Sequence, residues 1–492
     1  MIRKRLSLIL VLILCGKSFS VTPDQQSISK ACYVDGLSDR LRCGHVSVLE
    51  NPDDPSGPMI DIHFVVLPAI KPIKPEEVFL PITGGPGQSA IDNAASFGRT
   101  FAKIRETRDI LLIDQRGTGR SNLLACPENT TYSPLAMDDR SINYLTETKK
   151  CLSQLDGNVA MYGSLNAIND FESVRNFLGY EKLHIYGISY GSRMAQLYMR
   201  HHDEAIQTVT LDGVVPMQQS VLAIGMAIDR GLQSVFDQCK KDSFCNNEFP
   251  ELETTFDTLI RRIAETPIIT SVYHPLTGAP DSFLITRDKL LGIIRLSMYS
   301  PSSRALLPLA IAQAAKENYQ PLLGLFSLMM DGIDLAAGMH NSVVCSEDIH
   351  RVTPEMLAEI NESHAATTMY KAMSQACSIW PSNKVDEEFS SPITSSIPTL
   401  LLSGYFDPAT PPSWAELAMV NMINAKHFIA PYSSHGVAYQ TCANDLVAKL
   451  VELEELTELD DNCLTDQSSR GFFLNASSAQ PLLNNLSIKV SP

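Results

Sequence analysis

The residue best suited to chemistry in this chain is Ser189, in the pentapeptide Gly-Ile-Ser-Tyr-Gly at positions 187–191. The apolar run 183–186 before it predicts a strand, and the amphipathic segment 193–201 after it predicts a helix. A G-x-S-x-G turn between a strand and a helix holds its serine in a strained conformation, and the flanking glycines allow close backbone approach. We therefore predict that Ser189 is a nucleophile. The alternative is a serine in an ordinary glycine-rich turn.

A serine hydroxyl becomes nucleophilic when a histidine, oriented by a carboxylate, takes its proton. In a parallel sheet such groups lie at the carboxyl ends of strands. His435 follows the last predicted strand, 427–430, and Asp407 follows the strand before it. Asp212, after the strand that succeeds Ser189, is the alternative acid. The order Ser, Asp, His is typical of α/β-hydrolases. We predict a triad of Ser189, Asp407 and His435 that forms an acyl-enzyme on the serine.

Two glycine-rich loops follow predicted strands. Residues 83–89, Thr-Gly-Gly-Pro-Gly-Gln-Ser, form either a plain turn or a loop whose backbone N–H groups face developing negative charge. The loop lacks the lysine and hydroxyl residue of a phosphate-binding P-loop. Residues 114–121 lack the third glycine and the following helix of a dinucleotide site. For these residues we predict a solvated, internally hydrogen-bonded turn with Asp114 and Arg116 as structural partners.

Composition places the chain among globular proteins with a large core: 492 residues, 44% hydrophobic and 19% charged. Basic residues at 3–5, an apolar run at 6–15 and small residues near 20 predict a signal sequence over 1–20, and hence export to a periplasm or the medium. No segment is long enough to predict a membrane span. The net charge of -16 argues against nucleic acid or an anionic membrane as a partner. A monomer is the default expectation.

Eight strand candidates alternate with helical patterns, which predicts an α/β fold with a mostly parallel eight-stranded sheet. They are 46–49, 60–67, 78–82, 109–113, 183–186, 208–211, 399–403 and 427–430. Residues 216–392 show helical patterns without good alternating strands and are predicted to form a helical lid. The core then comprises 21–215 and 393–460. A polar tail, 461–492, has Cys463 as its one expected attachment.

Ten cysteines remain after the predicted signal, and an even number in an exported chain predicts disulfides. Pairing between sequence neighbours is the simplest arrangement, although the sequence does not prove it, and unpaired buried thiols are the alternative. These pairs are Cys32 with Cys43, Cys126 with Cys151, Cys239 with Cys245, Cys345 with Cys377, and Cys442 with Cys463. The spacing argues against zinc. We expect no metal and no other cofactor.

Five motifs in order along the chain resemble those of prolyl iminopeptidase-like serine exopeptidases, and most of all the secreted tripeptidyl aminopeptidases. They are GGPG at 84–87, DQRGTGRS at 114–121, GISYGS at 187–192, GYFDPATP at 404–411 and SSHG at 433–436. The resemblance implies an α/β-hydrolase fold, a peptide substrate and release of amino-terminal residues. It also implies an oxyanion hole formed by the N–H groups of Tyr190 and Gly85. Thr83 departs from the family, which more often has histidine there.

By the same resemblance, residues 344–348 correspond to a lid segment near the active site. Release from the amino end of a peptide requires a group that binds an ammonium ion, and a carboxylate suits that role. We therefore predict Glu347, with Asp348 as second choice, as the amine anchor; the alternative is a solvated charge pair. A rival function is a secreted ester or lactone hydrolase with the same triad, which a lid pocket without a carboxylate would favour. A binding module on an inactive scaffold is a third reading.

Overall fold

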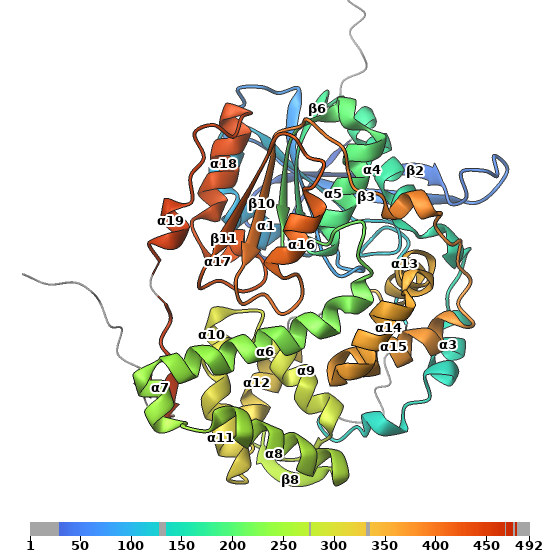
Figure 1. The fold of residues 1–492 in the computed structure, drawn as a ribbon. Helices are drawn as coiled ribbons and strands as arrows, with labels where there is room; N and C mark the ends of the chain where they lie inside the picture. The colour runs from blue at the N-terminus through green and yellow to red at the C-terminus, as the bar shows by residue number, and fades with distance from the viewer. Residues whose placement is uncertain are drawn as a thin grey trace, which may run out of the picture.

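A β-sheet in one half of the molecule and a helical block in the other make up the chain (Figure 1). The computed structural model describes residues 29–126, 134–274, 277–330, 335–467, 469–475 and 478–479. The predicted signal sequence lies outside the described residues.

In the described part of the chain, nine strands form the large sheet, in the order β1-β2-β3-β5-β4-β6-β7-β10-β11. They are β1 (Lys30–Cys32), β2 (Leu41–Leu49), β3 (Met59–Leu67), β4 (Glu77–Ile82), β5 (Asp109–Ile113), β6 (Lys182–Ile188), β7 (Ile206–Asp212), β10 (Thr399–Gly404) and β11 (Ala425–Ala430). The pairs β1–β2, β2–β3 and β3–β5 are antiparallel, and the other pairs are parallel. The eight predicted strands all form. The additional edge strand β1 has three residues, too few for a periodic signal.

Helices cover both faces of the sheet, which explains why strands such as β4 are buried along their whole length. One face packs against α4 (Ser164–Leu178) and α5 (Tyr190–His201). The other packs against α1 (Ala94–Thr100), α2 (Ala102–Arg105) and α18 (Ala443–Leu453). Shorter helices near the sheet are α16 (Pro412–Ala418), α17 (Val437–Gln440) and α19 (Asn462–Thr465). This layering leaves the carboxyl ends of the parallel strands to carry loops.

The helical block has a hydrophobic core of its own, and its helix α6 runs along the side that faces the sheet (Figure 1). Its elements are α6 (Ile224–Lys241), α7 (Ser243–Glu248), α8 (Leu252–Glu265), β8 (Ile268–Tyr273), β9 (Pro280–Ile285), α9 (Arg287–Ser297), α10 (Pro301–Arg304), α11 (Leu307–Ala315), α12 (Gln320–Met330), α13 (Ala337–Glu347), α14 (Pro354–Glu362) and α15 (His364–Cys377). We call it the lid. The antiparallel pair β8–β9 corrects the expectation of a lid without strands.

Segments outside 216–392 also join the lid. Leu135, before α3 (Tyr144–Leu152), belongs to the lid core, and so does Phe472. The N–H of Phe473, in β12 (Phe473–Asn475), donates to the carbonyl of Ala305. β12 pairs with β13 (Ser478–Ala479). The tail is therefore held by more than Cys463, because a short apolar patch within a polar segment packs on the lid.

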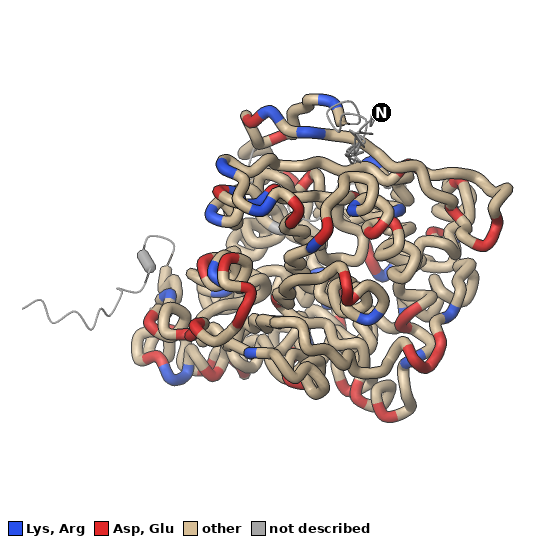
Figure 2. Tube along the Cα trace, turned by 90° about the horizontal axis from the view of Figure 1, so that it is seen from above, with Lys and Arg blue, Asp and Glu red and all other residues tan. Residues whose placement is uncertain are grey.

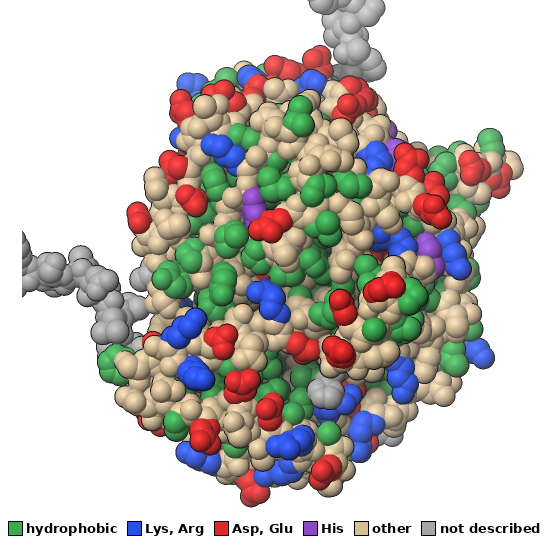
Figure 3. Space-filling view, viewed as in Figure 1, with side chains coloured by type: hydrophobic (Ala, Val, Ile, Leu, Met, Phe, Trp, Pro, Cys, Tyr) green, Lys and Arg blue, Asp and Glu red, His purple; other side chains and the backbone are tan. Residues whose placement is uncertain are grey.

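Five disulfides join the ten cysteines in sequence-neighbour pairs, as predicted. Cys345–Cys377 ties α13 to α15 within the lid, and Cys442–Cys463 ties α18 to α19. Among the described helices, none has the length and hydropathy of a membrane span. Acidic and basic residues are interspersed along the trace (Figure 2), and charges of both signs are spread over the face in Figure 3, with hydrophobic side chains between them.

Candidate active site

Ser189 occupies a strained turn between β6 and α5. Its backbone has φ 56° and ψ -125°, a region that residues other than glycine rarely adopt. Its N–H donates to the carbonyl of Asp212 over 2.9 Å. A Cβ at Gly187 would lie 2.3 Å from the carbonyl oxygen of Gly191, and one at Gly191 would lie 2.2 Å from that of Ile82. Both glycines are therefore required by close backbone approach, which is why the G-x-S-x-G pattern was informative.

Asp407 and His435 form a hydrogen-bonded pair beyond the ends of β10 and β11. The Nδ1 atom of His435 lies 2.8 Å from Oδ2 of Asp407. The Asp407 carboxylate also accepts from the N–H groups of Ala409 and Thr410, over 2.8 and 2.9 Å, and from the Thr410 hydroxyl over 2.7 Å. The carboxylate is buried and fixed by three donors besides the imidazole. It holds the Nδ1 side of the ring, so Nε2 is left to exchange a proton.

The pH dependence of hydrolysis should reflect the pKa of His435, which its hydrogen bond to Asp407 influences. Burial alone would lower the pKa of His435, but the charge and hydrogen bond of Asp407 outweigh burial and raise that pKa above its ordinary 6.5. The imidazole must be neutral to take the serine proton, so kcat/KM is lost as pH falls through this pKa. We expect the acidic limb of kcat/KM, measured from initial rates, to have its midpoint above pH 6.5. A midpoint below 6.5 would contradict the geometry of the pair.

Asp212, the alternative acid, has a different set of partners. Its carboxylate accepts from the hydroxyl of Tyr186 and from the N–H groups of Val437 and Ala438, at 2.8, 2.8 and 2.9 Å. These N–H groups begin α17, where unpaired donors need an acceptor. Asp212 thus attaches the helix after the His435 loop to the sheet, whereas Asp407 binds the imidazole itself.

The predicted oxyanion donors flank Ser189. Gly85 lines the same cavity as Ser189, and Tyr190 is the first residue of α5. Within the described residues, neither backbone N–H donates to another group, so both are available to a ligand. A Cβ at Gly84 would lie 3.0 Å from Cβ of Ser189, so glycine at this position lets the loop pass close to the serine.

Other segments hold the loop 83–89, which carries the predicted oxyanion donor Gly85, in place. The hydroxyl of Ser89 donates to Asp114 over 2.7 Å, and the N–H of Ala336 donates to the carbonyl of Gly87. Asp114 is fully buried and Arg116 is 1% exposed. The turn at 114–121 is internally hydrogen bonded, as predicted: the N–H of Gly117 donates to the carbonyl of Ser121, and the N–H of Arg120 donates to the Asp114 carboxylate. The prediction that this turn is solvated is wrong. Its polar residues are satisfied inside the protein, and Arg116 pairs with Asp170 over 2.6 Å.

A cavity of about 480 Å³ opens between sheet and lid, a size that suits a small molecule or a short peptide. Ser189 and His435 both line it. The Ser189 hydroxyl makes no hydrogen bond to a described residue, and such bonds often tighten only when substrate binds. Leu328, Leu335 and Tyr439 are lining residues with partly exposed side chains, Leu328 to 68%. Part of the exposed lining is therefore apolar.

The structure does not bring the predicted amine anchors to this cavity. Glu347 accepts from the N–H and the hydroxyl of Ser164, over 2.6 and 2.8 Å, and is 1% exposed. Asp348 pairs with Arg193 at 3.0 Å and is fully buried. Neither carboxylate lines the cavity. Both face the core at the end of α13, so they join the lid to α4 and α5.

Glu347 should make stability depend on pH. Burial raises its pKa from the ordinary 4.5 to about 7. The folded protein then binds the proton more tightly, so this contribution to stability is full below 4.5 and is lost as pH rises through about 7. Between pH 5 and pH 8 we expect the wild type to lose about 2 to 3 kcal/mol of unfolding free energy beyond any loss in Glu347→Gln, measured by urea denaturation. Glu359→Gln, exposed on α14, is the control and should keep the wild-type slope. Equal slopes in all three proteins would contradict the expectation.

Sequence reasoning missed three lid or loop residues that hold the site. Arg304 of α10 donates to the hydroxyl of Ser434 and the carbonyl of Tyr432, at 2.6 and 2.9 Å. Arg230 of α6 donates to the carbonyl of Asp407 over 2.7 Å. Thr410, described above, was quoted only as part of a motif. Arg230 lies in an amphipathic helix and Arg304 in a helix of four residues, Pro-Ser-Ser-Arg, and neither pattern indicates these contacts in the sequence.

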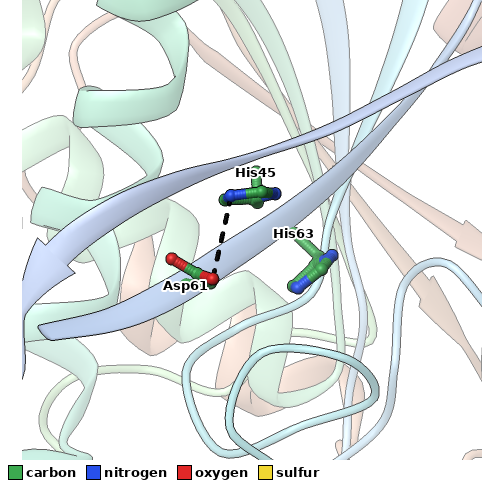
Figure 4. A group of neighbouring side chains, drawn as sticks. All are labelled: His45, Asp61 and His63. Carbon is green, nitrogen blue, oxygen red and sulfur yellow. Dashed lines mark ion pairs between the residues drawn. The ribbon is translucent and has the colours of Figure 1, made fainter. Parts of the chain in front are cut away.

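Two groups of described residues place potential metal-ligand atoms within 4.8 Å of one another. They are His45, Asp61 and His63, drawn in Figure 4, and Glu77, His184 and Glu454. The first group lies on β2 and β3 and is largely exposed; the second is occupied by ion pairs, with Lys74 and Arg108 on Glu77. Neither group lines the cavity. We assign neither a part in its chemistry.

The order of the sheet, the strained turn at Ser189 and the cavity beneath the lid define an α/β-hydrolase, a hydrolytic enzyme. A sequence profile of the alpha/beta hydrolase fold matches residues 77–256, and one described as TAP-like protein matches residues 362–463. The chain belongs to the TAP-like, prolyl iminopeptidase-like family of α/β-hydrolases.

Three relatives differ in how much of the chain they cover. Serine protease Hip1 of Mycobacterium tuberculosis (strain ATCC 25618 / H37Rv) is 23% identical over 442 residues, covering 82% of this chain and 84% of that protein. Putative hydrolase YuaR of Escherichia coli (strain K12) is 28% identical over 216 residues, 41% of this chain and 43% of YuaR. Proline iminopeptidase of Neisseria gonorrhoeae is 29% identical over 132 residues, 27% of this chain and 30% of that enzyme.

Proposed function

We propose that this protein is a serine peptidase that releases residues from the amino ends of short peptides. The observation that carries the proposal is the strained Ser189 at a lid-covered cavity that it shares with His435, itself hydrogen bonded to Asp407. A cavity of this size below a lid favours the end of a chain over an internal segment of a folded protein. The names of the relatives, serine protease Hip1 and proline iminopeptidase, support peptides as substrates.

In the proposed reaction, Oγ of Ser189 attacks the peptide carbonyl carbon while Nε2 of His435 takes the hydroxyl proton. The negative charge on the carbonyl oxygen is met by the N–H groups of Gly85 and Tyr190. The C–N bond then breaks as His435 returns the proton to the leaving amine. Water, activated by the same imidazole, hydrolyses the acyl-enzyme. Asp407 stabilises the imidazolium in both steps.

A carboxylic ester or lactone hydrolase is the second candidate, and one observation favours it. Among the described residues, no aspartate or glutamate lines the cavity. We also propose that the enzyme acts outside the cytoplasm; its five disulfides support this, because disulfides persist in oxidising compartments.

Product analysis decides between these candidates. The purified protein is incubated with unblocked peptides, their N-acetylated counterparts and short acyl esters, and the products are identified by mass spectrometry. The proposal predicts release of amino-terminal fragments from the unblocked peptides and little from the acetylated ones. Hydrolysis of esters alone would establish the second candidate. Equal cleavage of both peptide forms would retain the peptidase but remove the amino-end restriction.

A further inference from the structure

The cavity contains a cation that lacks a carboxylate partner. Among the described lining residues Arg295, in the last turn of α9, is the one Asp, Glu, Lys or Arg residue. Its Nη atoms reach only the hydroxyl of Tyr299, at 3.4 Å, and the sulfur of Met369, at 3.8 Å. Its Nε is buried and has no acceptor in the described protein. A guanidinium carries five N–H donors, so most of this capacity is unused.

Three arginines that are more deeply buried than Arg295 bind oxygen atoms of the protein, although the Nε of Arg193 also has no acceptor among the described residues. Arg116 binds both oxygens of Asp170, and Arg193 binds both oxygens of Asp348. Arg304 donates to two oxygens of the His435 loop. A bidentate carboxylate is the partner that best fits the planar guanidinium. Arg295 differs from these three because its free donors lie at a cavity that can admit such a partner from outside.

The position of Arg295 also fixes where that partner would lie. The edge of the Tyr299 ring contacts His435, with ring centroids 5.0 Å apart, and Arg295 donates to the hydroxyl of the same tyrosine. The guanidinium is therefore within roughly the length of three extended residues from the imidazole. Leucines at 296, 325 and 335 line the same cavity, and apolar walls strengthen a charge pair by excluding water.

We propose that Arg295 binds a carboxylate of the substrate, so that the protein prefers peptides with a negative charge within about three residues of the scissile bond. This inference rests on the proposed function and names its substrate class. The carboxylate comes either from the carboxyl terminus of a short peptide or from an Asp or Glu side chain. A carboxylate anchor would instead favour a positively charged ammonium group of the substrate, so the two expectations differ in the sign of the preferred charge.

Matched peptides test the preference. One pair differs only in a free or amidated carboxyl terminus, and further pairs carry Glu or Gln at single positions on either side of the bond. A charge-assisted pair predicts a kcat/KM about 10- to 100-fold higher for the acidic member of at least one pair. The pair that shows the difference identifies the source of the carboxylate. The preference should weaken at high salt.

Variants of Arg295 assign the preference to this side chain. In Arg295→Gln the acidic-to-neutral ratio should fall to about 1, and in Arg295→Glu it should fall below 1, because the charge is reversed. Arg287→Gln is the matched control: it lies on the same helix, pairs with Asp288 and does not line the cavity, so it should keep the wild-type ratio. A wild-type ratio of 1 for every pair, or an unchanged ratio in Arg295→Gln, would overturn the proposal. Should Arg295→Gln fail to fold, Arg295→Lys replaces it. Lysine keeps the positive charge but cannot bind a carboxylate through two N–H groups of a planar guanidinium, so the acidic-to-neutral ratio of kcat/KM is expected to be intermediate.

A second readout separates this proposal from the proposed function. A fluorophosphonate labels Ser189 without any peptide turnover, and bound peptides slow the labelling. Acidic peptides should protect the wild type at lower concentration than their neutral partners, and should lose that advantage in Arg295→Gln. If the wild type is labelled but cleaves no peptide, the peptidase function fails while the protection experiment still decides the role of Arg295. If peptides are cleaved without charge preference and protect equally, only the Arg295 proposal fails.

Discussion

Replacing Ser189 by alanine is expected to lower kcat by about 10⁶-fold and to abolish labelling by a fluorophosphonate, while the protein stays folded. The reason is chemical: the acyl-enzyme needs the serine Oγ, and the described cavity lining offers no cysteine or lysine to replace it. The variant should stay folded because alanine keeps the Cβ atom of Ser189 and removes only its hydroxyl. Peptide hydrolysis by high-performance chromatography and gel fluorescence of the labelled protein measure the two effects.

The control for this variant is Ser173→Ala. Ser173 lies on α4, and its hydroxyl donates to the carbonyl of Asn169, away from the cavity. It should retain wild-type hydrolysis and labelling. Full activity in Ser189→Ala would end the assignment of the nucleophile. Residual activity must be checked for contamination by the wild type, because a 10⁶-fold loss is below the purity of most preparations.

Replacing Asp407 by asparagine should cost about 10⁴-fold in kcat, because the amide binds the wrong tautomer of the imidazole and cannot stabilise its protonated form. Labelling by a fluorophosphonate should slow but persist, since the serine and the oxyanion donors remain. The acidic limb of kcat/KM should also move to lower pH, because loss of the carboxylate removes what raises the pKa of His435. Stopped assays at high enzyme concentration across pH 5–9 measure both effects.

Asp212→Asn separates the two candidate acids. Its carboxylate accepts two N–H groups of α17 and the Tyr186 hydroxyl, so the variant should lose stability by about 1 to 3 kcal/mol. Its kcat should fall far less than that of Asp407→Asn. A loss of about 10⁴-fold in kcat for Asp212→Asn, with little loss for Asp407→Asn, would show that Asp407 does not act in catalysis through His435. Urea denaturation and kcat on the same two proteins give the comparison.

Much of the fold was predictable because its central strands, such as β4, β6, β7 and β10, are buried on both faces and read as apolar runs between turns. The residues proposed as the triad were predictable for a related reason: each follows a strand of the parallel sheet within a few residues. Ser189 also required glycines on both sides, since backbone oxygens lie within 2.3 Å of where a Cβ would be. These are local constraints, and a sequence records them directly.

Other features depend on packing between distant segments, and the sequence was silent or misleading about them. Glu347 and Asp348 lie at the end of α13, where the way a side chain faces depends on how the lid seats on α4 and α5. The β8–β9 hairpin was missed because several of its positions are exposed and polar. Arg295 gives no signal within an amphipathic helix, since its unpaired state becomes visible only when its neighbours in space are known.

The contacts of Arg230, Arg304 and Ala336 have a consequence for how such an enzyme can diversify. Each comes from the lid side, and together they brace the loops that carry Asp407, His435 and the proposed oxyanion donor Gly85. The geometry of the active site thus depends on contacts from the lid, so the lid cannot be exchanged without affecting that geometry. A chimera that receives a foreign lid without equivalents of these braces should fold its sheet yet align its catalytic groups poorly. New substrate ranges are then more accessible by replacing cavity side chains one at a time than by transplanting the whole insertion.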